Sequence, residues 1–359
     1  MADIPATEVC LFGHLDCPFT PGVDVHIVRF DIIVRRIARA ANRCESGRVT
    51  MRVLVVGGTG LLGQHVVAEL GRRGHEADTL ARGNASVPGD VRRLSVSEWA
   101  PRLDGVDGVV WATGADDREI PRAPADRFYH DANVEPLRRF LVAARVAECR
   151  RVVICGSYFT ALHRAHPDWR LAEHHPYVRS RLGQIDLAAR YSGAVLEIPL
   201  VFGSADGRRS MWAPAVPWLR SRLPLVAHPG GTAVVSATTV GRAAVAALER
   251  AAEGPYPVVD ANLTWRDLVA RLAVAAGRRG SPTVRRLPPA VLRAVLRATG
   301  LRYRLAGREP GLGATWVPDL LMSELYLDES PCRALGVPGG DLDRAFRDTI
   351  AAARPGSGM

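Results

Sequence analysis

The stretch VLVVGGTGLLGQHVV, residues 53–67, decides the fold of this chain. Its first four residues predict a buried strand, and the apolar positions after the glycines recur at helical spacing. Between them, Gly57 permits a tight turn, Gly60 lets the backbone approach a pyrophosphate, and Gly63 lets the helix pack on the strand. The helix N-terminus offers amide groups and a positive dipole end to phosphates. The stretch predicts a dinucleotide site; a purely structural glycine turn is the alternative.

Strand and helix continue to alternate along the chain. Short apolar runs predict strands at 77–80, 91–94, 106–112, 151–155 and 194–198, with helices over 136–147 and 177–191. Repeated strand–helix–strand units predict a parallel sheet with helices on both faces. We therefore expect an α/β fold, a doubly wound parallel sheet of the Rossmann type, over residues 51–205.

The amino-acid composition changes after residue 205, where proline-rich segments predicted to be loops contain tryptophans. Helices are predicted there at 238–252, 264–276 and 288–298, and Thr264 with Asp267 forms a capping box for the middle one. We expect residues 206–359 to form a smaller substrate-binding lobe. Residues 1–50 are predicted to be a poorly ordered N-terminal extension with one amphipathic helix at 30–43.

Composition fits an ordinary globular protein of 359 residues, because 47% of them are hydrophobic. No run approaches the roughly 18 to 20 apolar residues of a membrane span, and the start lacks the pattern of a secretory signal. We expect no membrane association and a cytoplasmic location. The six cysteines are interpreted as reduced thiols. Cys10, His14 and Cys17 are interpreted as chance spacing, so no metal site is predicted.

The formal net charge of +10 raises the question of a nucleic-acid partner. All 47 basic residues are arginines, and they are scattered rather than gathered in a long basic run with interleaved aromatics. Nucleic acid is therefore the less favoured partner. Arginine holds bidentate oxyanions well, so a phosphorylated cofactor or substrate is the better use of the excess.

The end of the second predicted strand bears on the choice of cofactor. NAD-binding sites place an acidic residue there for the ribose hydroxyls. Here the residues are Ala81 and Arg82, and Asp78 lies too early in the strand. A cation beside that position suits the 2′-phosphate of NADP, so NADP is predicted over NAD; a solvated loop arginine is the alternative.

At this point the chain resembles the extended short-chain dehydrogenase/reductases, also called the NAD-dependent epimerase/dehydratase family. The resemblance runs from Met51 to about Gly203 through the segments GGTGLLG, VVWATG, NVEPLRRFLVAA, RVVICGS, HPYVRSR and LEIPLVFG, with a weaker echo beyond. It implies a catalytic serine at Ser157 and an acid/base tyrosine at Tyr177. It implies cofactor contacts by the following residues: Gly57, Thr59, Gly60, Leu61, Leu62, Gly63, Arg82, Asp90, Val91, Ala112, Thr113, Gly114, Tyr177, Arg181, Pro199 and Val201.

The stretch HPYVRSR, residues 175–181, departs from the family pattern, because Arg181 stands where the family has lysine. One helical turn separates it from Tyr177, so both side chains can face the cofactor. A guanidinium can stabilise tyrosinate and bind ribose hydroxyls, but it does not readily give up a proton. The change points to altered catalysis, a relay through water, or lost activity. His174 and His175 are alternative proton carriers, or polar residues of a helix-entry loop.

These observations predict an NADP-dependent oxidoreductase acting on a carbonyl or secondary alcohol of a small molecule. Hydride transfer at such a carbon needs a proton moved at the oxygen, which Tyr177 would carry while Ser157 holds the substrate. Trp212, Trp218, Arg208 and Arg209 are candidates for the substrate pocket, with packing as the alternative. An epimerase or dehydratase, a catalytically silent NADP-binding sensor, and an RNA-associated relative stay open as functions. A homodimer also stays open.

Overall fold

The main sheet has seven strands in the order β10-β6-β5-β4-β1-β2-β3, and every neighbouring pair is parallel. The computed structural model describes residues 50–280 and 282–353. The strands of this sheet are β1 (Arg52–Val56), β2 (Glu76–Ala81), β3 (Val87–Pro88), β4 (Gly108–Trp111), β5 (Arg151–Cys155), β6 (Ala194–Glu197) and β10 (Gly254–Pro257). Successive strands are added on one side of β1 up to β3 and on its other side from β4 onward. Doubly wound sheets bind ligands at such a switch point, here between β1 and β4. The predicted fold class is confirmed.

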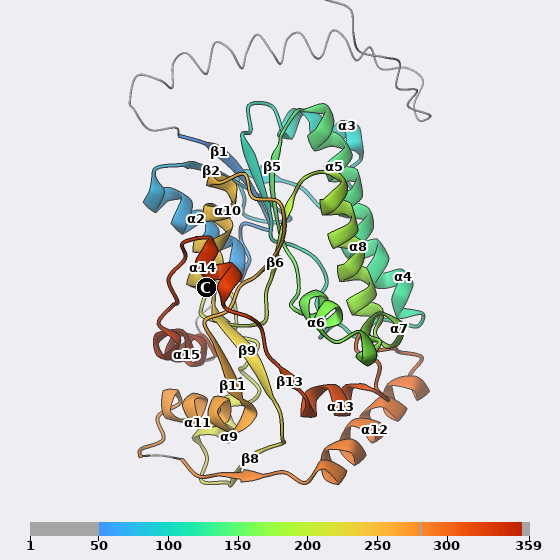
Figure 1. Ribbon diagram of the computed structural model, residues 1–359, viewed down its shortest axis with the longest axis vertical. Helices are drawn as coiled ribbons and strands as arrows, with labels where there is room; N and C mark the ends of the chain where they lie inside the picture. Colours follow the sequence, from blue (N-terminus) through green and yellow to red (C-terminus); the bar gives the residue numbers. More distant parts are fainter. Residues whose placement is uncertain (1–49, 281, 354–359) are drawn as a thin grey trace, which may run out of the picture. The chain divides into compact units, whose positions relative to one another are not determined.

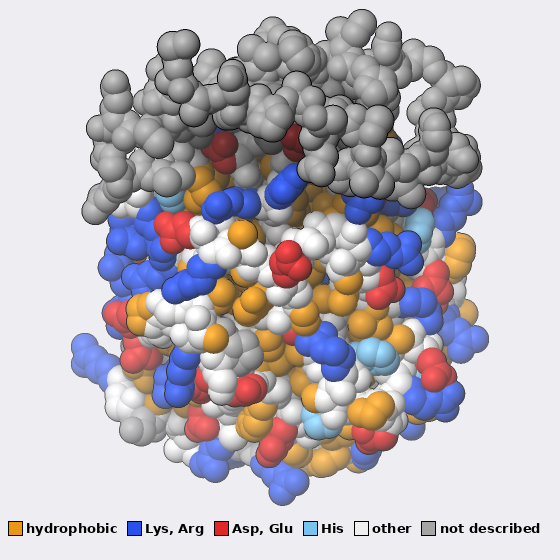
Figure 2. Space-filling view, turned by 45° about the horizontal axis from the view of Figure 1, so that its top comes forward, with side chains coloured by type: hydrophobic (Ala, Val, Ile, Leu, Met, Phe, Trp, Pro, Cys, Tyr) orange, Lys and Arg blue, Asp and Glu red, His pale blue; other side chains and the backbone are white. Residues whose placement is uncertain are grey.

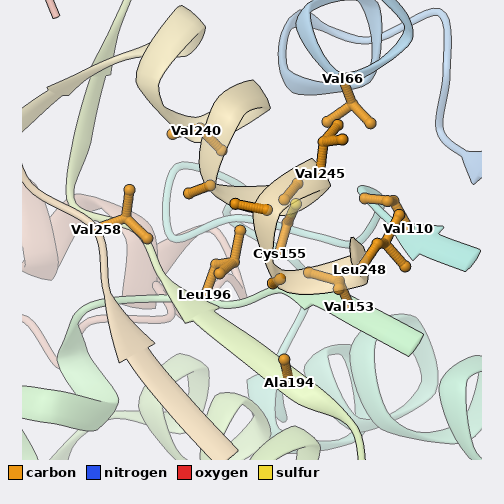
Figure 3. Close-up of a cluster of buried hydrophobic side chains, with 14 of the residues drawn as sticks. Val66, Val110, Val153, Cys155, Ala194, Leu196, Val240, Val245, Leu248 and Val258 are labelled. Carbon is orange, nitrogen blue, oxygen red and sulfur yellow. The ribbon is translucent and has the colours of Figure 1, made fainter. Parts of the chain in front are cut away.

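Helices cover both faces of this sheet (Figure 1). On one face lie α2 (Leu61–Arg73) and α10 (Ala237–Glu249), whose apolar side chains meet the strands in a buried cluster (Figure 3). On the other lie α3 (Val96–Trp99), α5 (Glu135–Val146) and α8 (Pro176–Arg190). There Trp99, Trp111 and Phe140 are fully buried, with ring centroids 5.1–6.0 Å apart. Burial on both faces explains why the central strands are continuous apolar runs.

A second region lies beyond the carboxyl ends of these strands (Figure 1). Its strand β9 (Gly231–Ser236) pairs with β7 (Leu200–Phe202), β11 (Ala261–Thr264) and β13 (Glu324–Leu325), while β8 (Leu225–Ala227) pairs with β12 (Val284–Arg286). Its helices are α9 (Val216–Arg220), α11 (Trp265–Ala275), α12 (Pro289–Leu305), α13 (Val317–Met322), α14 (Ser330–Ala334) and α15 (Leu342–Ala351). The Thr264 hydroxyl accepts a hydrogen bond from the Asp267 amide at 3.1 Å, which confirms the N-cap half of the predicted capping box.

The remaining helices of the main-sheet region lie between β4 and β6 in the sequence. They are α4 (Ala125–Tyr129), a π-helical turn (His130–Val134), α6 (Phe159–Ala165), a 3-10 turn (Pro167–Trp169) and α7 (Leu171–His174). A further 3-10 turn (Ala100–Arg102) follows α3.

The main sheet and its covering helices include elements from both sides of the predicted boundary at residue 205. Helix α10 packs on that sheet and β10 pairs with β6, although both follow residue 205. The chain thus enters the second region through β7 and returns before leaving again at β11. Whether 51–205 and 206–359 behave as separate domains stays a prediction.

The predicted strand at 91–94 is wrong. The Asp90 carboxylate accepts a hydrogen bond from the Arg92 amide at 3.0 Å, and the Asp90 carbonyl accepts one from the Arg93 amide at 2.9 Å. These local bonds close a turn, as aspartate favours. The edge strand β3 forms earlier, where Val87 and Pro88 pair with the end of β2.

Several predictions concern residues outside the described part, namely the 1–50 extension, its 30–43 helix and the Cys10, His14 and Cys17 spacing. Over residues 50–280 and 282–353, no helix is long and apolar enough to cross a membrane. The cytoplasmic location stays a prediction. On the face in Figure 2, arginines lie interspersed with carboxylates and apolar side chains.

Candidate functional site

The glycine loop between β1 and α2 leaves no space for a Cβ atom at two of its glycines. Gly57 has a φ of +85°, and a Cβ added to it would lie 2.4 Å from the Ala112 carbonyl oxygen. A Cβ on Gly63 would lie 2.2 Å from the Gly57 carbonyl oxygen. The first glycine is thus required by the turn and the third by the close approach of α2 to the loop.

A cavity of about 850 Å³ opens beside this loop. It is lined by these residues predicted to contact the cofactor: Gly57, Thr59, Gly60, Arg82, Asp90, Val91, Ala112, Thr113 and Gly114. No acidic side chain follows the end of β2, where Ala81 and the exposed Arg82 stand. The loop, the helix N-terminus and the size of the cavity fit a dinucleotide, because backbone can approach phosphates where Cβ atoms are excluded.

A second cavity of about 350 Å³ adjoins the first and shares Ala112, Thr113 and Gly114 with it. It gathers the remaining predicted site residues apart from Gly63, which lies behind the loop: Leu61, Leu62, Ser157, Tyr177, Arg181, Pro199 and Val201. Aromatic and aliphatic side chains complete its wall: Tyr158, Phe159, Met211, Trp265, Leu312 and Leu321. The two cavities together offer one site for a cofactor and a small molecule.

Tyr177, Ser157 and Arg181 are all buried where they line this second cavity. The Arg181 guanidinium carbon lies 5.1 Å from the centre of the Tyr177 ring. Burial raises the pKa of Tyr177, and the positive charge of Arg181 opposes that rise. The Asp117 carboxylate raises the same pKa, whereas hydrogen bonding by Ser157 and Arg181 lowers it. The net pKa is above the usual value for a phenol, which keeps Tyr177 protonated as a proton donor.

Arg181 is held by neutral partners. One of its terminal nitrogens donates to the Gln184 side-chain oxygen at 2.8 Å and the other to the Ala115 carbonyl at 3.0 Å. Its Nε is buried with no partner among the described residues. Because no carboxylate pairs with the guanidinium there, its charge remains available to a phenolate or an added ligand.

Comparison with known proteins bears on this arrangement. Residues 53–203 match the NAD dependent epimerase/dehydratase family. A 3-diazoavenalumate denitrifying reductase from Streptomyces sp is 28% identical over 275 residues, which cover 67% of this chain and 86% of that protein. A 4-hydroxy-tetrahydrodipicolinate reductase from Natronomonas pharaonis is 45% identical over 60 residues, 17% of this chain.

The chain spans about a quarter, 24%, of the length of the Natronomonas protein. Among solved structures, the human epimerase family protein SDR39U1, determined with NADPH, is similar with a TM-score of 0.62 at 17% identity. That likeness covers 84% of this chain and 99% of the human one, and it shows a shared fold.

Sequence reasoning missed one buried residue of the segment 53–203, Asn133. Its Oδ1 accepts from the Ala115 amide at 2.7 Å, and its Nδ2 donates to the Ala115 carbonyl at 3.2 Å and to the Ser180 hydroxyl at 3.0 Å. Gln184 donates to its backbone carbonyl at 2.9 Å. Asn133 therefore ties the loop after β4 to the helix of Tyr177. A lone polar residue before the apolar positions of 135–146 was the available signal.

The residues predicted for a substrate pocket lie in different places in the structure, some at a cavity and some in the core. Arg208 lines the cofactor cavity and donates to the Thr59 carbonyl at 3.1 Å. Trp212 stacks on Phe202 with centroids 5.2 Å apart, and Trp218 donates to the Pro224 carbonyl at 3.3 Å. Both tryptophans pack against the core of the second region. Met211, which the sequence did not single out, lines the smaller cavity instead.

The two histidines before Tyr177 have structural partners. His175 is buried and its Nδ1 accepts from the Gly313 amide at 2.9 Å; burial lowers its pKa to about 4. His174 stacks on Trp316 with ring centroids 3.9 Å apart. Neither lines the described cavities. This position favours the alternative that the pair belongs to the helix-entry loop. Over the described residues, no group of three or more His, Cys, Asp or Glu could hold a metal ion.

Proposed function

We propose that this chain is an NADP-dependent oxidoreductase acting on a carbonyl or secondary alcohol of a small molecule. The observation that carries the proposal is the meeting of three buried side chains, Ser157, Tyr177 and Arg181, in one cavity that adjoins the cofactor cavity. The family of residues 53–203 supports an NAD(P)-dependent enzyme. The Streptomyces relative, which matches most of both chains, is a reductase by name and favours net reduction.

The chain's own residues would share the work as follows. The nicotinamide, when bound, supplies or accepts the hydride. Tyr177 gives its phenolic proton to the substrate oxygen in the reducing direction and takes it back in the oxidising one. Ser157 positions that oxygen by hydrogen bonding. Arg181 lowers the cost of the phenolate but keeps its own proton, so the phenol regains a proton through a hydroxyl or water.

The preference for NADP rests on the cations of the larger cavity. Arg82 follows β2 with its side chain exposed at the cavity wall, and Arg92 and Arg208 also line it. A 2′-phosphate would add about two negative charges to that region, and guanidinium groups bind phosphate oxygens bidentately. Arg208 is placed to reach the phosphates near the glycine loop, because it already contacts Thr59.

The experiment is to incubate the full chain with NADPH and a panel of small aldehydes and ketones, following NADPH absorbance and product together. We expect one NADPH consumed for each carbonyl reduced. A transient-oxidation epimerase or dehydratase would convert a sugar-like substrate with no net change in cofactor. A silent sensor would bind NADPH without any turnover, and either result would replace the proposal. A homodimer stays a prediction.

A further inference from the structure

The loop after β4 places a second carboxylate beside that of Asp116 on the wall of the smaller cavity. Asp117 lines that cavity and is partly buried. Over the described residues it has no ion pair, whereas the adjacent Asp116 pairs with Arg118. Burial and the Asp116 charge raise the pKa of Asp117, and the charges of Arg118 and Arg181 oppose this rise only in part.

The backbone on either side of Asp117 is held firmly. The Ala115 amide and carbonyl are bonded to Asn133, and the same carbonyl accepts from Arg181. The Tyr129 hydroxyl lies 2.6 Å from the Glu119 carbonyl and 3.2 Å from the Asp116 carbonyl. A loop fixed on both sides cannot easily turn this carboxylate out to water. A positively charged ligand would offset the free energy that burial of this carboxylate costs, because it would favour the ionised form that burial disfavours.

The other walls of the cavity suit a cation as well. Tyr158, Phe159 and Trp265 present aromatic rings, whose faces attract positive charge. Neither arginine of the wall forms an ion pair with Asp117, because Arg118 pairs with Asp116 and Arg181 donates to Gln184 and the Ala115 carbonyl. The Asp117 carboxylate is therefore a group on this wall with which a ligand cation could pair directly.

We propose that Asp117 is a substrate-binding residue that selects molecules carrying a positively charged nitrogen, such as a primary ammonium, on an apolar body beside the reacting carbon. The proposal rests on the oxidoreductase function proposed above for the same cavity. It adds a consequence for Tyr177. Asp117 opposes formation of the tyrosinate, and a cation bound to Asp117 would remove that opposition.

The test uses two probes of one shape in the NADP-saturated full chain. One is an aryl methyl ketone with a ring ammoniomethyl group, and the other has an ethyl group in that place. Calorimetry should give a Kd roughly ten- to a hundredfold lower for the ammonium probe, the range of a charge-assisted bond. Asp117→Asn should abolish that preference by weakening the ammonium probe alone, while Asp117→Glu restores part of it. Asp186→Asn, the same change on the exposed side of α8, should leave both Kd values unchanged.

Four results would overturn the proposal, and three of them concern the two probes and the cofactor. They are equal binding of the two probes by the unmutated chain, equal weakening of both probes by Asp117→Asn, and weakening of NADPH by that variant, which would assign Asp117 to the cofactor. An analogue with a hydroxymethyl group that binds better than the ammonium probe would also overturn it. If the ammonium preference depends on Asp117 but no carbonyl is reduced, the selectivity stands and the oxidoreductase function fails. The two proposals are thus separable.

Discussion

Two glycines of helix α2 should respond to the same substitution with opposite signs. In Gly63→Ala the added Cβ would lie 2.2 Å from the Gly57 carbonyl oxygen and 2.6 Å from the Gly58 Cα, both backbone atoms. Real contacts of this kind keep at least 3.0 Å, so the loop must move by close to an ångström. Such overpacking costs about 1–3 kcal/mol. A displaced phosphate loop should also weaken NADPH binding by roughly a hundredfold, as misplacements of that size do.

Gly71→Ala is the matched control, because Gly71 is exposed near the end of the same helix and a Cβ there meets nothing within 4 Å. Alanine in place of a helical glycine should raise the free energy of unfolding by about 0.5–1 kcal/mol. NADPH affinity should not change. Urea unfolding with and without NADPH, and titration of NADPH fluorescence, measure both effects. A Gly63→Ala variant as stable as the unmutated chain, with unchanged NADPH affinity, would refute the role given to this glycine.

Three further predictions concern the arginines of the site. Arg82→Ala should weaken NADPH at least tenfold more than NADH, as loss of a charged phosphate contact does; equal losses would exclude a 2′-phosphate contact. Arg208→Gln should weaken both cofactors, whereas Arg209→Gln, at the adjacent exposed position, should weaken neither. Equal effects of these two variants would exclude a phosphate contact by Arg208. Because Arg181 lowers the Tyr177 pKa, Arg181→Gln should raise it and move the acidic limb of alcohol oxidation, where Tyr177 becomes protonated, to higher pH. An unmoved limb in that pH–rate profile would show that Arg181 does not act on the tyrosine.

The main sheet was predictable because its signals are local. A buried strand, a glycine turn and an amphipathic helix follow one another within 53–67, and central strands covered on both faces must be apolar throughout. Strand β10 escaped prediction, since GPYP has two prolines and is a strand only by pairing at the edge with β6. The turn at Asp90 escaped because its apolar neighbours suggested a strand.

The candidate site was also predictable only in part. Ser157, Tyr177 and Arg181 were found through a family resemblance, since nothing local shows that Ser157 faces a helix twenty residues later. Asn133 acts through bonds to Ala115, and Arg208 through Thr59, so both depend on contacts that only the folded chain creates. Single polar residues of this kind form no spacing pattern from which the sequence alone could predict their contacts.

The central claim is that Tyr177 moves the proton in a reaction for which the site supplies the cofactor. The most direct test measures NADPH binding and carbonyl reduction in Tyr177→Phe, beside Tyr191→Phe, whose ring packs under the Arg145 guanidinium at the end of α8. We expect Tyr177→Phe to bind NADPH as the unmutated chain does and to lose roughly a hundred- to ten-thousandfold in kcat, with Tyr191→Phe fully active. Undiminished turnover in Tyr177→Phe would contradict the account.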